Sequence, residues 1–349
     1  MTPRVTVLMS VFNGGVYLRE AIESILAQTF ADYEFLIVDD GSTDDTPSIL
    51  RGYRDARIRV LTNERNVGLT ASLNRGLGEA RGEWIARQDA DDRSHPQRLQ
   101  RQLAFVAAHP EVTVAGTQAR VIDARGRAVG MSRKPRTSIG IAWCSVFHNP
   151  LLHSSVIFRR NAILEAGGYD EAYPFNQDFE LWSRLMERHP LANIDDVLID
   201  HRVHGASIAG RRDPAVLASR IENVARNQRI QHRNVLRETG SPELAEEWPE
   251  LWTAMNVPWL TNAPSDPRRA LELVARLWEA FRRTHAEAEL TEEMRSITAS
   301  SLLVIALYLA RRDRIAAARA LWRAYRDDRA QTARALPRWM FHLAGGGRI

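Results

Sequence analysis

The stretch VTVLMSVFNGGVYLREAIESILAQTFADYEFLIVDDGSTDDT, residues 5–46, decides the fold of this 349-residue chain. The apolar run over 5–9 predicts a buried strand, and apolar residues spaced i, i+4, i+7 and i+8 from Leu18 predict one face of a helix. A second apolar run over 35–38 predicts the next strand, and the Asp, Gly, Ser and Thr residues after it are typical of a turn and a helix cap. The stretch therefore begins an alternation of strands and helices.

The alternation continues beyond this stretch. Apolar runs over 58–61 and 84–86 predict two more strands, and helical apolar faces follow them over 69–80 and 99–106. Strict alternation predicts the α/β fold class, with a mostly parallel sheet flanked by helices on both faces. Sheets of this kind bind ligands in the crevice at the carboxyl ends of their strands.

Polar side chains stand at the carboxyl end of each predicted strand. In chain order they are Ser10 and Asn13, Asp39 and Asp40, Asn66 and Gly68, and then Asp89, Asp91 and Asp92. Each group alone could be a helix cap or a turn. Their coincidence at one edge of the sheet predicts a ligand site there.

The stretch IARQDADDR, residues 85–93, places three carboxylates within four positions directly after an apolar run. Like charges this close repel one another, so a positive group is expected among them, either a neighbouring arginine or a metal ion. Mg²⁺ is typically held by one or two carboxylates together with substrate phosphates, and a D-x-D triplet just past a strand offers that arrangement. The cluster is therefore predicted to be a metal site.

The pattern changes after residue 112. Short strands are expected over 112–114, 121–123 and 155–158, with a hairpin turn at 124–126. Further on, Asp178 falls in the first turn of a predicted helix.

Beyond Asp213 the sequence is almost wholly helical in pattern, and helices over 303–309 and 315–325 look like an antiparallel pair. Two domains are therefore predicted, an α/β domain over residues 1–212 and a C-terminal all-α domain over 213–349.

Composition narrows the setting of the protein. The chain has one cysteine, Cys144, so no disulfide framework is expected and a reducing, cytoplasmic location is predicted. The N-terminus lacks a signal-peptide pattern, and the longest apolar run, over 302–310, is too short to span a bilayer. The formal net charge is only +4 and Lys134 is the single lysine, so no nucleic-acid partner is expected.

The basic excess is concentrated at the C-terminus. From Arg311 to the end there are ten Arg against three Asp, and Trp339-Met340-Phe341 could lie in a membrane interface. These helices predict peripheral association with the inner face of the plasma membrane. A solvated helix face, with the aromatic residues packed on the helical domain, is the alternative.

An ordered set of motifs resembles the family 2 glycosyltransferases of the GT-A fold. The set consists of the opening stretch, NVGL (66–69), GEWIARQDADD (82–92), GGYDE (167–171), NQDFELW (176–182) and HRVHGASI (201–208), and the match covers residues 4 to about 208. The resemblance implies a nucleotide-binding sheet and an inverting transfer of a sugar from a nucleotide diphosphate sugar, most often of the UDP or dTDP type, to a hydroxyl of a glycan or lipid-linked acceptor. Surface glycan or polysaccharide biosynthesis is the setting that it implies.

The resemblance also implies roles for individual residues. Those placed around the nucleotide sugar are Ser10, Asn13, Asp39, Asp40, Gly68, Asn74 and Asp89, with Asp40 accepting a hydrogen bond from the base. Those placed at the Mn²⁺ or Mg²⁺ ion are Asp91 as the direct ligand, Asp89 and His204. Asp178 matches the catalytic base, and the dipole of its helix favours its ionised form.

Two positions depart from the pattern of the family. Leu73 stands where many members have Arg, which leaves the contacts to the base open, and Gln177 stands where many have Glu. Gln177 can still donate a hydrogen bond, so it is not expected to abolish activity.

Two other functions remain as alternatives. The first is a nucleotidyltransferase that synthesises sugar nucleotides, although such enzymes usually carry a Gly-rich, Arg- or Lys-containing loop where this chain has Ser10 to Asn13. The second is a non-catalytic scaffold that binds nucleotide sugars.

Some histidines and tryptophans lie outside the motif roles. His148 and His153 fall near an expected acceptor region, with buried or loop histidines as the alternative, while Trp143 and Trp182 could stack on sugars or belong to the core.

Overall fold

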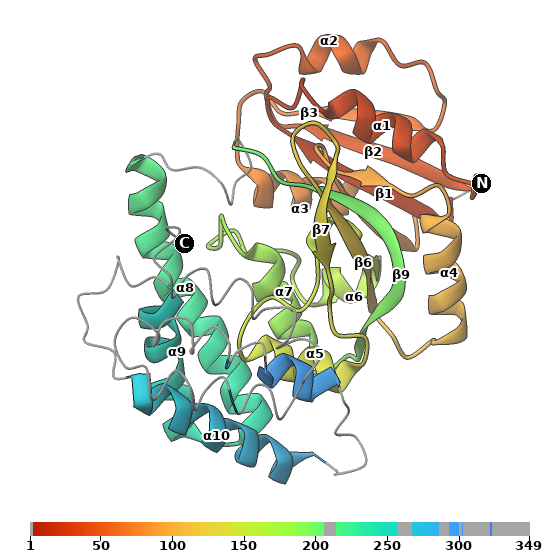
Figure 1. The fold of residues 1–349 in the computed structure, drawn as a ribbon. Helices are drawn as coiled ribbons and strands as arrows, with labels where there is room; N and C mark the ends of the chain where they lie inside the picture. Colours follow the sequence, from red (N-terminus) through yellow and green to blue (C-terminus); the bar gives the residue numbers. More distant parts are fainter. Residues whose placement is uncertain are drawn as a thin grey trace. The chain divides into compact units, whose positions relative to one another are not determined.

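The computed structural model describes residues 3–205, 214–256, 267–285 and 293–299, together with positions 302 and 322. The chain divides into two compact units (Figure 1). The first consists of Met1–Ser138 and Pro150–Ala218, and the second of Ile139–Asn149 and Ser219–Ile349. The domain boundary predicted at 212/213 falls among residues that are not described and stays a prediction.

The first unit is built on one mixed sheet, with the strand order β3-β2-β1-β4-β8-β6-β9-β5 and with β7 paired to β6 within the described residues. The strands are β1 (Val5–Val11), β2 (Tyr33–Asp39), β3 (Ile58–Thr62), β4 (Trp84–Asp89), β5 (Arg93–Ser94), β6 (Val114–Ile122), β7 (Ala128–Ser132), β8 (Ile157–Arg159) and β9 (Leu191–Arg202). The parallel pairs β1–β2, β1–β4, β2–β3 and β6–β9 are long, whereas the antiparallel pairs are short. The predicted α/β class with a mostly parallel sheet is confirmed.

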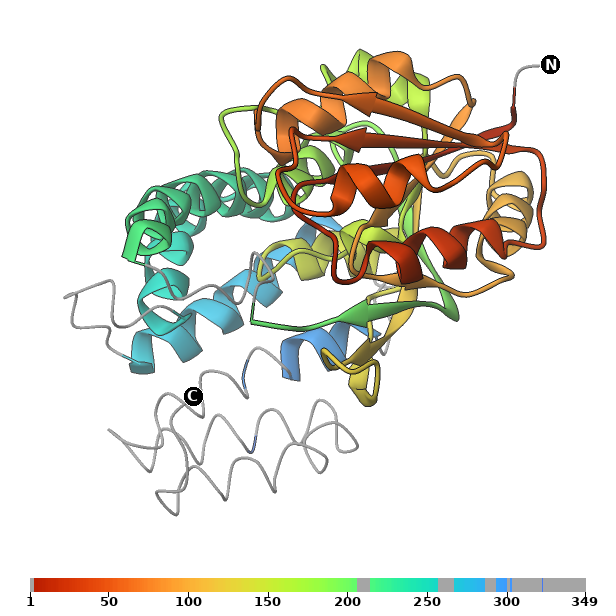
Figure 2. The ribbon, with the colours of Figure 1, turned by 90° about the horizontal axis from the view of Figure 1, so that it is seen from above.

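Helices cover both faces of the sheet because its central strands are apolar on both sides. Val5, Val7 and Met9 of β1 pack into one core with α1 (Leu18–Leu26), α2 (Thr46–Arg51) and α4 (Arg98–Ala108). On the other face α3 (Leu69–Glu79) approaches Leu8 and Val38 so closely that a Cβ at Gly76 would collide with the Leu8 side chain. Figure 2 shows α1 and α3 on opposite sides of β1.

One prediction about the strands is wrong. The two strands expected over 112–114 and 121–123 are a single strand, β6, which continues through the buried polar residues between them although its pairing with β9 shifts register at Gln118. Gln118, for example, donates to the Lys134 carbonyl and accepts from the Lys134 amide. The hairpin turn at 124–126 is confirmed, since the Gly126 amide bonds the Asp123 carbonyl between β6 and β7.

The sequence expected a strand over 155–158. In the structure a 3-10 helix (His153–Ser155) comes first, and β8 begins at Ile157. Helix α6 (Arg160–Glu165) follows β8, and α7 (Gln177–Leu185) carries Asp178 in its first turn, as predicted.

The second unit is helical wherever it is described, as the sequence predicted. Its main helices are α8 (Pro214–Thr239), α9 (Pro242–Asn256) and α10 (Pro267–Thr284), while α5 (Ser138–Ser145) supplies Trp143. Trp143 is fully buried. Its ring packs edge-on against the Phe147 ring and at a tilt against the Phe281 ring, and its indole N–H donates to the Thr298 hydroxyl at 3.0 Å. Trp143 is therefore a core residue.

The C-terminal predictions lie outside the described residues. These are the helix pair over 303–309 and 315–325 (apart from position 322), the basic tail and the Trp339-Met340-Phe341 anchor. Where the chain is described, none of its helices is long and apolar enough to cross a membrane.

Candidate active site

The register of the parallel strands brings predicted site residues to one edge of the sheet. Ser10 of β1 stands opposite Asp89 of β4, and Val11 stands opposite Asp39 of β2. Asp39 in turn stands opposite Thr62 at the end of β3. Carboxylates from two strands and a hydroxyl from a third therefore meet where α/β sheets bind ligands.

Asp40 organises the loop that follows β3. Its Oδ1 accepts hydrogen bonds from Nδ2 of Asn63 at 2.6 Å and from the Val67 amide at 3.0 Å, and its Oδ2 accepts one from the Gly68 amide at 2.9 Å. Asp39 accepts one from the Ser42 amide at 3.1 Å. Three loop donors therefore bond the two oxygens of Asp40. The hydrogen bond predicted between Asp40 and the base of the nucleotide stays a prediction.

Asn13 ties the loop after β1 to the loop after β2. Its Oδ1 accepts hydrogen bonds from the Thr43 amide at 2.8 Å and the Asp44 amide at 3.3 Å, while its own amide donates to the Ser42 hydroxyl at 3.0 Å. The residue has a φ of 52°, a left-handed conformation that Asn tolerates better than most residues. Asn13 therefore shapes the rim of the edge, and its contact with a nucleotide stays a prediction.

Asn74 of α3 holds the turn before the predicted base. Its Oδ1 accepts from the Tyr169 amide at 2.9 Å, and its Nδ2 donates to the Tyr169 carbonyl at 2.8 Å and to Glu171 at 3.2 Å. Both ends of the amide are thus bonded within the protein. The predicted contact between Asn74 and the nucleoside stays a prediction. The hydrogen bonds of Asn74 to Tyr169 and Glu171 do not favour it.

The three carboxylates after β4 have three different partners. Oδ1 of Asp89 accepts a hydrogen bond at 2.6 Å from Arg87, whose side chain is completely buried. Burial disfavours the charged form of Asp89, but the charge of Arg87, its hydrogen bond and the charge of His201 outweigh it and lower the pKa of Asp89. The positive group expected in this cluster is therefore, at Asp89, an arginine.

Asp92 connects the loop after β4 to other parts of the unit. It is buried, its Oδ1 accepts from the Arg202 amide at 2.7 Å, and its Oδ2 accepts from the Ser154 hydroxyl and faces Nδ1 of His201 at 3.1 Å. Burial lowers the pKa of His201, but the hydrogen bond to Asp92 and the nearby negative charges outweigh that effect and raise it. Asp92 therefore fastens the loop after β4 to β9.

Asp91 pairs with His204. The Oδ2 atom of Asp91 lies 2.9 Å from Nε2 of His204, and one third of the Asp91 side chain is exposed. Burial and the charges of Asp89 and Asp92 raise the pKa of Asp91 to about 6, although His204 opposes the shift. The ring of Tyr17 lies 4.8 Å from the ring of His204.

Arg202 holds the loop that carries Asp91, and the sequence analysis assigned it no role. The residue is buried, donates from Nε to the Asp91 carbonyl at 2.9 Å, and bonds Glu20 at 2.7 Å. Its guanidinium also lies over the Tyr17 ring. The signal in the sequence was its place in the motif HRVHGASI (201–208), where only His204 had been given a role.

The donor chemistry of this cluster fits a hard divalent cation. Among the described residues, no group of three or more Asp, Glu, His and Cys side chains forms a complete metal cage. Such a cage is not required, because Mg²⁺ is commonly bound by one or two carboxylates and completed by substrate phosphates. The raised pKa of Asp91 reflects burial first and then the negative charges of Asp89 and Asp92, and a cation at Asp91 and His204 would offset both effects.

Asp178 lies near the same cluster. It is 9% exposed in the first turn of α7, and its charge acts on His153 and Tyr169, as does the charge of Asp89. His153 and Tyr169 are joined by a contact of 2.8 Å between Nε2 and the phenol oxygen. Burial and the charge of Arg87 lower the pKa of His153 to about 4, so this ring is neutral at pH 7.

Local structure fixes the start of α7. Asn176 precedes the helix in the left-handed conformation, with a φ of 56°. One turn later Glu180 is buried and paired with Arg184, which donates to the Gly168 carbonyl at 2.7 Å. These contacts hold the helix against the turn that Asn74 anchors.

Known glycosyltransferases resemble this chain in sequence. The family model described as Glycosyl transferase family 2 matches residues 6–164. EpsE of Bacillus subtilis (strain 168), named as a glycosyltransferase, is 36% identical over 193 residues, which are 53% of this chain and 67% of EpsE. The amylovoran biosynthesis glycosyltransferase AmsE of Erwinia amylovora is 29% identical over 222 residues, 62% of this chain and 83% of AmsE. The chain thus spans about two thirds of EpsE.

Solved structures support the fold. S. aureus TarS (residues 1–349) in complex with UDP-GlcNAc aligns with a TM-score of 0.57 and 17% identity, covering 96% of this chain and 92% of TarS. The mannosyltransferase PcManGT from Pyrobaculum calidifontis, in complex with GDP-Man and Mn²⁺, aligns with a TM-score of 0.53 and 20% identity, covering 92% and 88%. At these identities the likeness shows the fold alone, and it confirms the predicted GT-A type of fold.

The motif order, the match of the family model and the identity to EpsE lead to one conclusion, which also confirms the predicted enzyme class. The chain belongs to glycosyl transferase family 2.

Proposed function

We propose that the protein transfers a sugar from a nucleotide diphosphate sugar to a hydroxyl of a glycan or lipid-linked acceptor, with inversion at the anomeric carbon. The observation that carries this proposal is the placement of Asp91, paired with His204, beside the sheet edge formed by Ser10, Asp39 and Asp89. A nucleotide lies along such an edge, and its diphosphate lies at the exposed carboxylate.

Asp178 is the base in this mechanism. The acceptor oxygen attacks the anomeric carbon from the face opposite the leaving group and forms the new glycosidic bond. The bond to the diphosphate oxygen breaks, and the hydroxyl proton passes to the Asp178 carboxylate. A Mn²⁺ or Mg²⁺ ion held by Asp91 and His204, with Asp89 close by, would supply charge neutralisation for the departing diphosphate.

His153 and Tyr169 belong to the same region. Because the pKa of His153 is lowered to about 4, this ring adds no positive charge that would compete with a cation at Asp91. In this mechanism the pair supplies fixed polar groups in a region on which the charges of both Asp89 and Asp178 act.

The comparisons support the choice of donor and setting. TarS is described with UDP-GlcNAc and PcManGT with GDP-Man and Mn²⁺, so both classes of nucleotide belong in the test. The name of AmsE refers to amylovoran biosynthesis, which supports a role in polysaccharide assembly. We take a UDP or dTDP sugar as the donor.

The test combines binding and turnover. A thermal-shift screen of UDP, dTDP and GDP, each with and without Mn²⁺, should show a metal-dependent rise in Tm for the nucleotide of the donor. Donor hydrolysis with the matching sugar nucleotide should then fall by about 10²–10⁴-fold in Asp178→Asn, while nucleotide binding is retained.

Asp196→Asn is the matched control, because Asp196 is an exposed carboxylate whose partner is Arg101 on the surface. Near wild-type turnover by Asp178→Asn would remove Asp178 as the base. Release of pyrophosphate from a sugar 1-phosphate and a nucleoside triphosphate would instead favour a nucleotidyltransferase.

A further inference from the structure

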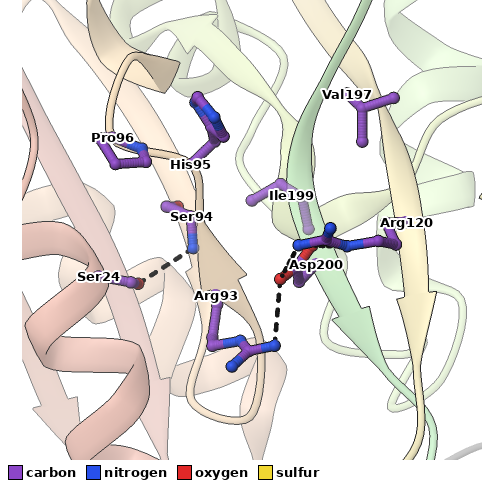
Figure 3. Close-up of a pocket in the computed structure, with 9 residues that line it drawn as sticks. All are labelled: Ser24, Arg93, Ser94, His95, Pro96, Arg120, Val197, Ile199 and Asp200. Atoms are coloured by element: carbon purple, nitrogen blue, oxygen red, sulfur yellow. Dashed lines mark hydrogen bonds and ion pairs between the residues drawn. The ribbon is translucent and has the colours of Figure 1, made fainter. Parts of the chain in front are cut away.

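A pocket opens in the first unit, and none of its lining residues is one of the residues predicted to bind the nucleotide or the metal. Its volume is about 540 Å³, within the range of small-molecule sites and large enough for one or two sugar rings. Figure 3 shows that it lies between α1, the short strand β5 and strands β6 and β9. The lining residues that matter here are Arg93, Pro96, Arg120, Val197, Ile199 and Asp200.

Two guanidinium groups share one carboxylate in this pocket. Arg120 binds Asp200 in a bidentate manner, with contacts of 2.7 Å from Nε and 2.8 Å from a terminal nitrogen. Arg93 reaches Asp200 from the other side, but only at 3.2 Å (Figure 3). The pocket therefore holds more positive than negative charge at this end.

Arg93 is only loosely held. Its other contacts, to Glu20 at 3.5 Å and to the Gly126 carbonyl at 3.4 Å, are also long. Its Nε is buried and has no hydrogen-bond partner among the residues that the structure describes. A buried N–H group without a partner is costly, so the present contacts of Arg93 do not fully satisfy its guanidinium.

The rest of the pocket wall combines three polar residues, Ser24, Ser94 and His95, with an apolar patch. Val197, Ile199 and Pro96 form that patch, and the neighbouring hydroxyl of Ser24 is already engaged, since it accepts from the Ser94 amide and donates to the Ala21 carbonyl. An apolar surface beside a charged end suits a sugar ring, which can place its C–H face on the aliphatic side chains and its polar substituents toward the guanidinium groups.

Two ion pairs through Glu20 connect the pocket to the loop that carries Asp91. Glu20 contacts both Arg93 and Arg202, and Arg202 donates to the backbone carbonyl of Asp91. A saccharide in the pocket would therefore lie close to the candidate active site without occupying the sheet edge where the donor is proposed to bind.

We infer that this pocket binds a saccharide unit carrying one anionic group, which is received between Arg93 and Arg120, and that it anchors an acidic acceptor glycan. The identification of the ligand as an acceptor rests on the proposed function. The anion can be a carboxylate, as in a uronic acid, or a phosphate ester, since guanidinium groups bind both in a bidentate manner.

Calorimetric titration of the full chain tests this inference. The probes are cellobiouronic acid and glucose 6-phosphate, with cellobiose and inorganic phosphate as the matched neutral sugar and free anion. At least one anionic saccharide should bind tenfold or more tightly than both controls, and the tighter of the two identifies the source of the anion. Equal binding of cellobiose, or equal binding of inorganic phosphate, would overturn the inference.

Variants locate the binding. Arg120→Met should weaken the anionic saccharide at least tenfold, and Arg101→Met should change it less than twofold, because Arg101 is equally exposed and also paired with one aspartate but lies outside the pocket. Arg93→Lys provides a second probe that keeps the charge but removes the guanidinium group, and it should weaken binding several-fold. Unchanged affinity in both pocket variants would contradict the assignment.

Nucleotide binding distinguishes a failure of the proposed function from a failure of the proposed saccharide pocket. Arg120→Met should retain the Tm rise with the donor nucleotide and Mn²⁺, because its contacts lie outside the sheet edge. Saccharide binding without any nucleotide binding would leave the pocket standing and reject the proposed function. Nucleotide binding without saccharide binding would do the reverse.

Discussion

The Nε2 atom of His204 lies 2.9 Å from Oδ2 of Asp91, although 113 positions separate the two residues in the chain. Asp91 follows β4 and His204 follows β9, so the sheet and the contacts of Arg202 and Asp92 bring them together. In the proposed function these two side chains would hold the Mn²⁺ or Mg²⁺ ion.

The first prediction concerns this pair. His204→Ala should raise the Mn²⁺ concentration needed for half-maximal donor hydrolysis by about 10–100-fold, because changes to the support of a metal typically cost that much affinity. His109→Ala is the control, since His109 pairs with Glu111 on the surface. A Mn²⁺ titration of each variant checks the expectation, and identical curves for His204→Ala and wild type would exclude His204 from the metal site.

The second prediction concerns the pH dependence of stability. The pKa of His153 is about 4 in the folded protein, below the value near 6.5 of an exposed histidine. Between these two values the unfolded chain binds more protons than the folded one, so acidification destabilises the fold through this residue and stability is regained as the pH rises. The loss between pH 7 and pH 4.5 should be on the order of 2 kcal/mol.

Urea unfolding at pH 7 and at pH 4.5 measures this contribution. His153→Gln removes the titrating group but keeps a side chain that can bond the Tyr169 hydroxyl. The variant should show a smaller difference in unfolding free energy between the two pH values than the wild type. A pH dependence equal to that of the wild type would show that His153 is not the group responsible.

The third prediction concerns the buried Arg87. Arg87→Met leaves Asp89 without its 2.6 Å partner in a crowded set of carboxylates, and it should lower the free energy of unfolding by about 2–4 kcal/mol. The double variant Arg87→Met with Asp89→Asn should recover part of this loss, because no charge is then left unpaired. Arg159→Met, which breaks the exposed pair with Glu83, should cost about 0.5 kcal/mol or less.

Equilibrium unfolding of the wild type, Arg87→Met, Asp89→Asn and the double variant gives the coupling energy between Arg87 and Asp89. If the double variant is as unstable as the sum of the two single variants, the pair contributes no interaction energy, and Arg87 acts through packing alone.

The fourth prediction concerns the residue that begins the base helix. Asn176 has a φ of 56°, where Gly is tolerated and Ala is strained by about 1 kcal/mol. Asn176→Gly should therefore keep kcat within a few-fold. Asn176→Ala should lower kcat while the affinity for the donor nucleotide stays the same, because the start of α7 positions Asp178. An equal fall in both variants would indicate that the Asn side chain, and not the backbone conformation, matters.

Much of the fold could be read from local pattern. Apolar runs bounded by turn residues located β1 to β4, and the i, i+4 spacing located α1, because a strand or helix that buries one face must repeat apolar residues at its own period. The same logic failed at β6, where buried Thr117 and Gln118 interrupt the apolar run but bond backbone carbonyls, Thr117 that of Gln118 and Gln118 that of Lys134. Local polarity cannot reveal that a distant backbone will satisfy a buried amide.

By itself, the sequence determined the α/β class, the family and the identity of the residues at the strand ends, since these follow from spacing along the chain. Only the tertiary structure decided how the charges are shared: Asp89 with Arg87, Asp92 with β9, and Asp91 with His204. Electrostatic interactions depend on distance in space and on burial, and neither can be known before the strands are paired. For the same reason the pocket around Arg93 and Arg120 exists only once β5, β6 and β9 lie side by side.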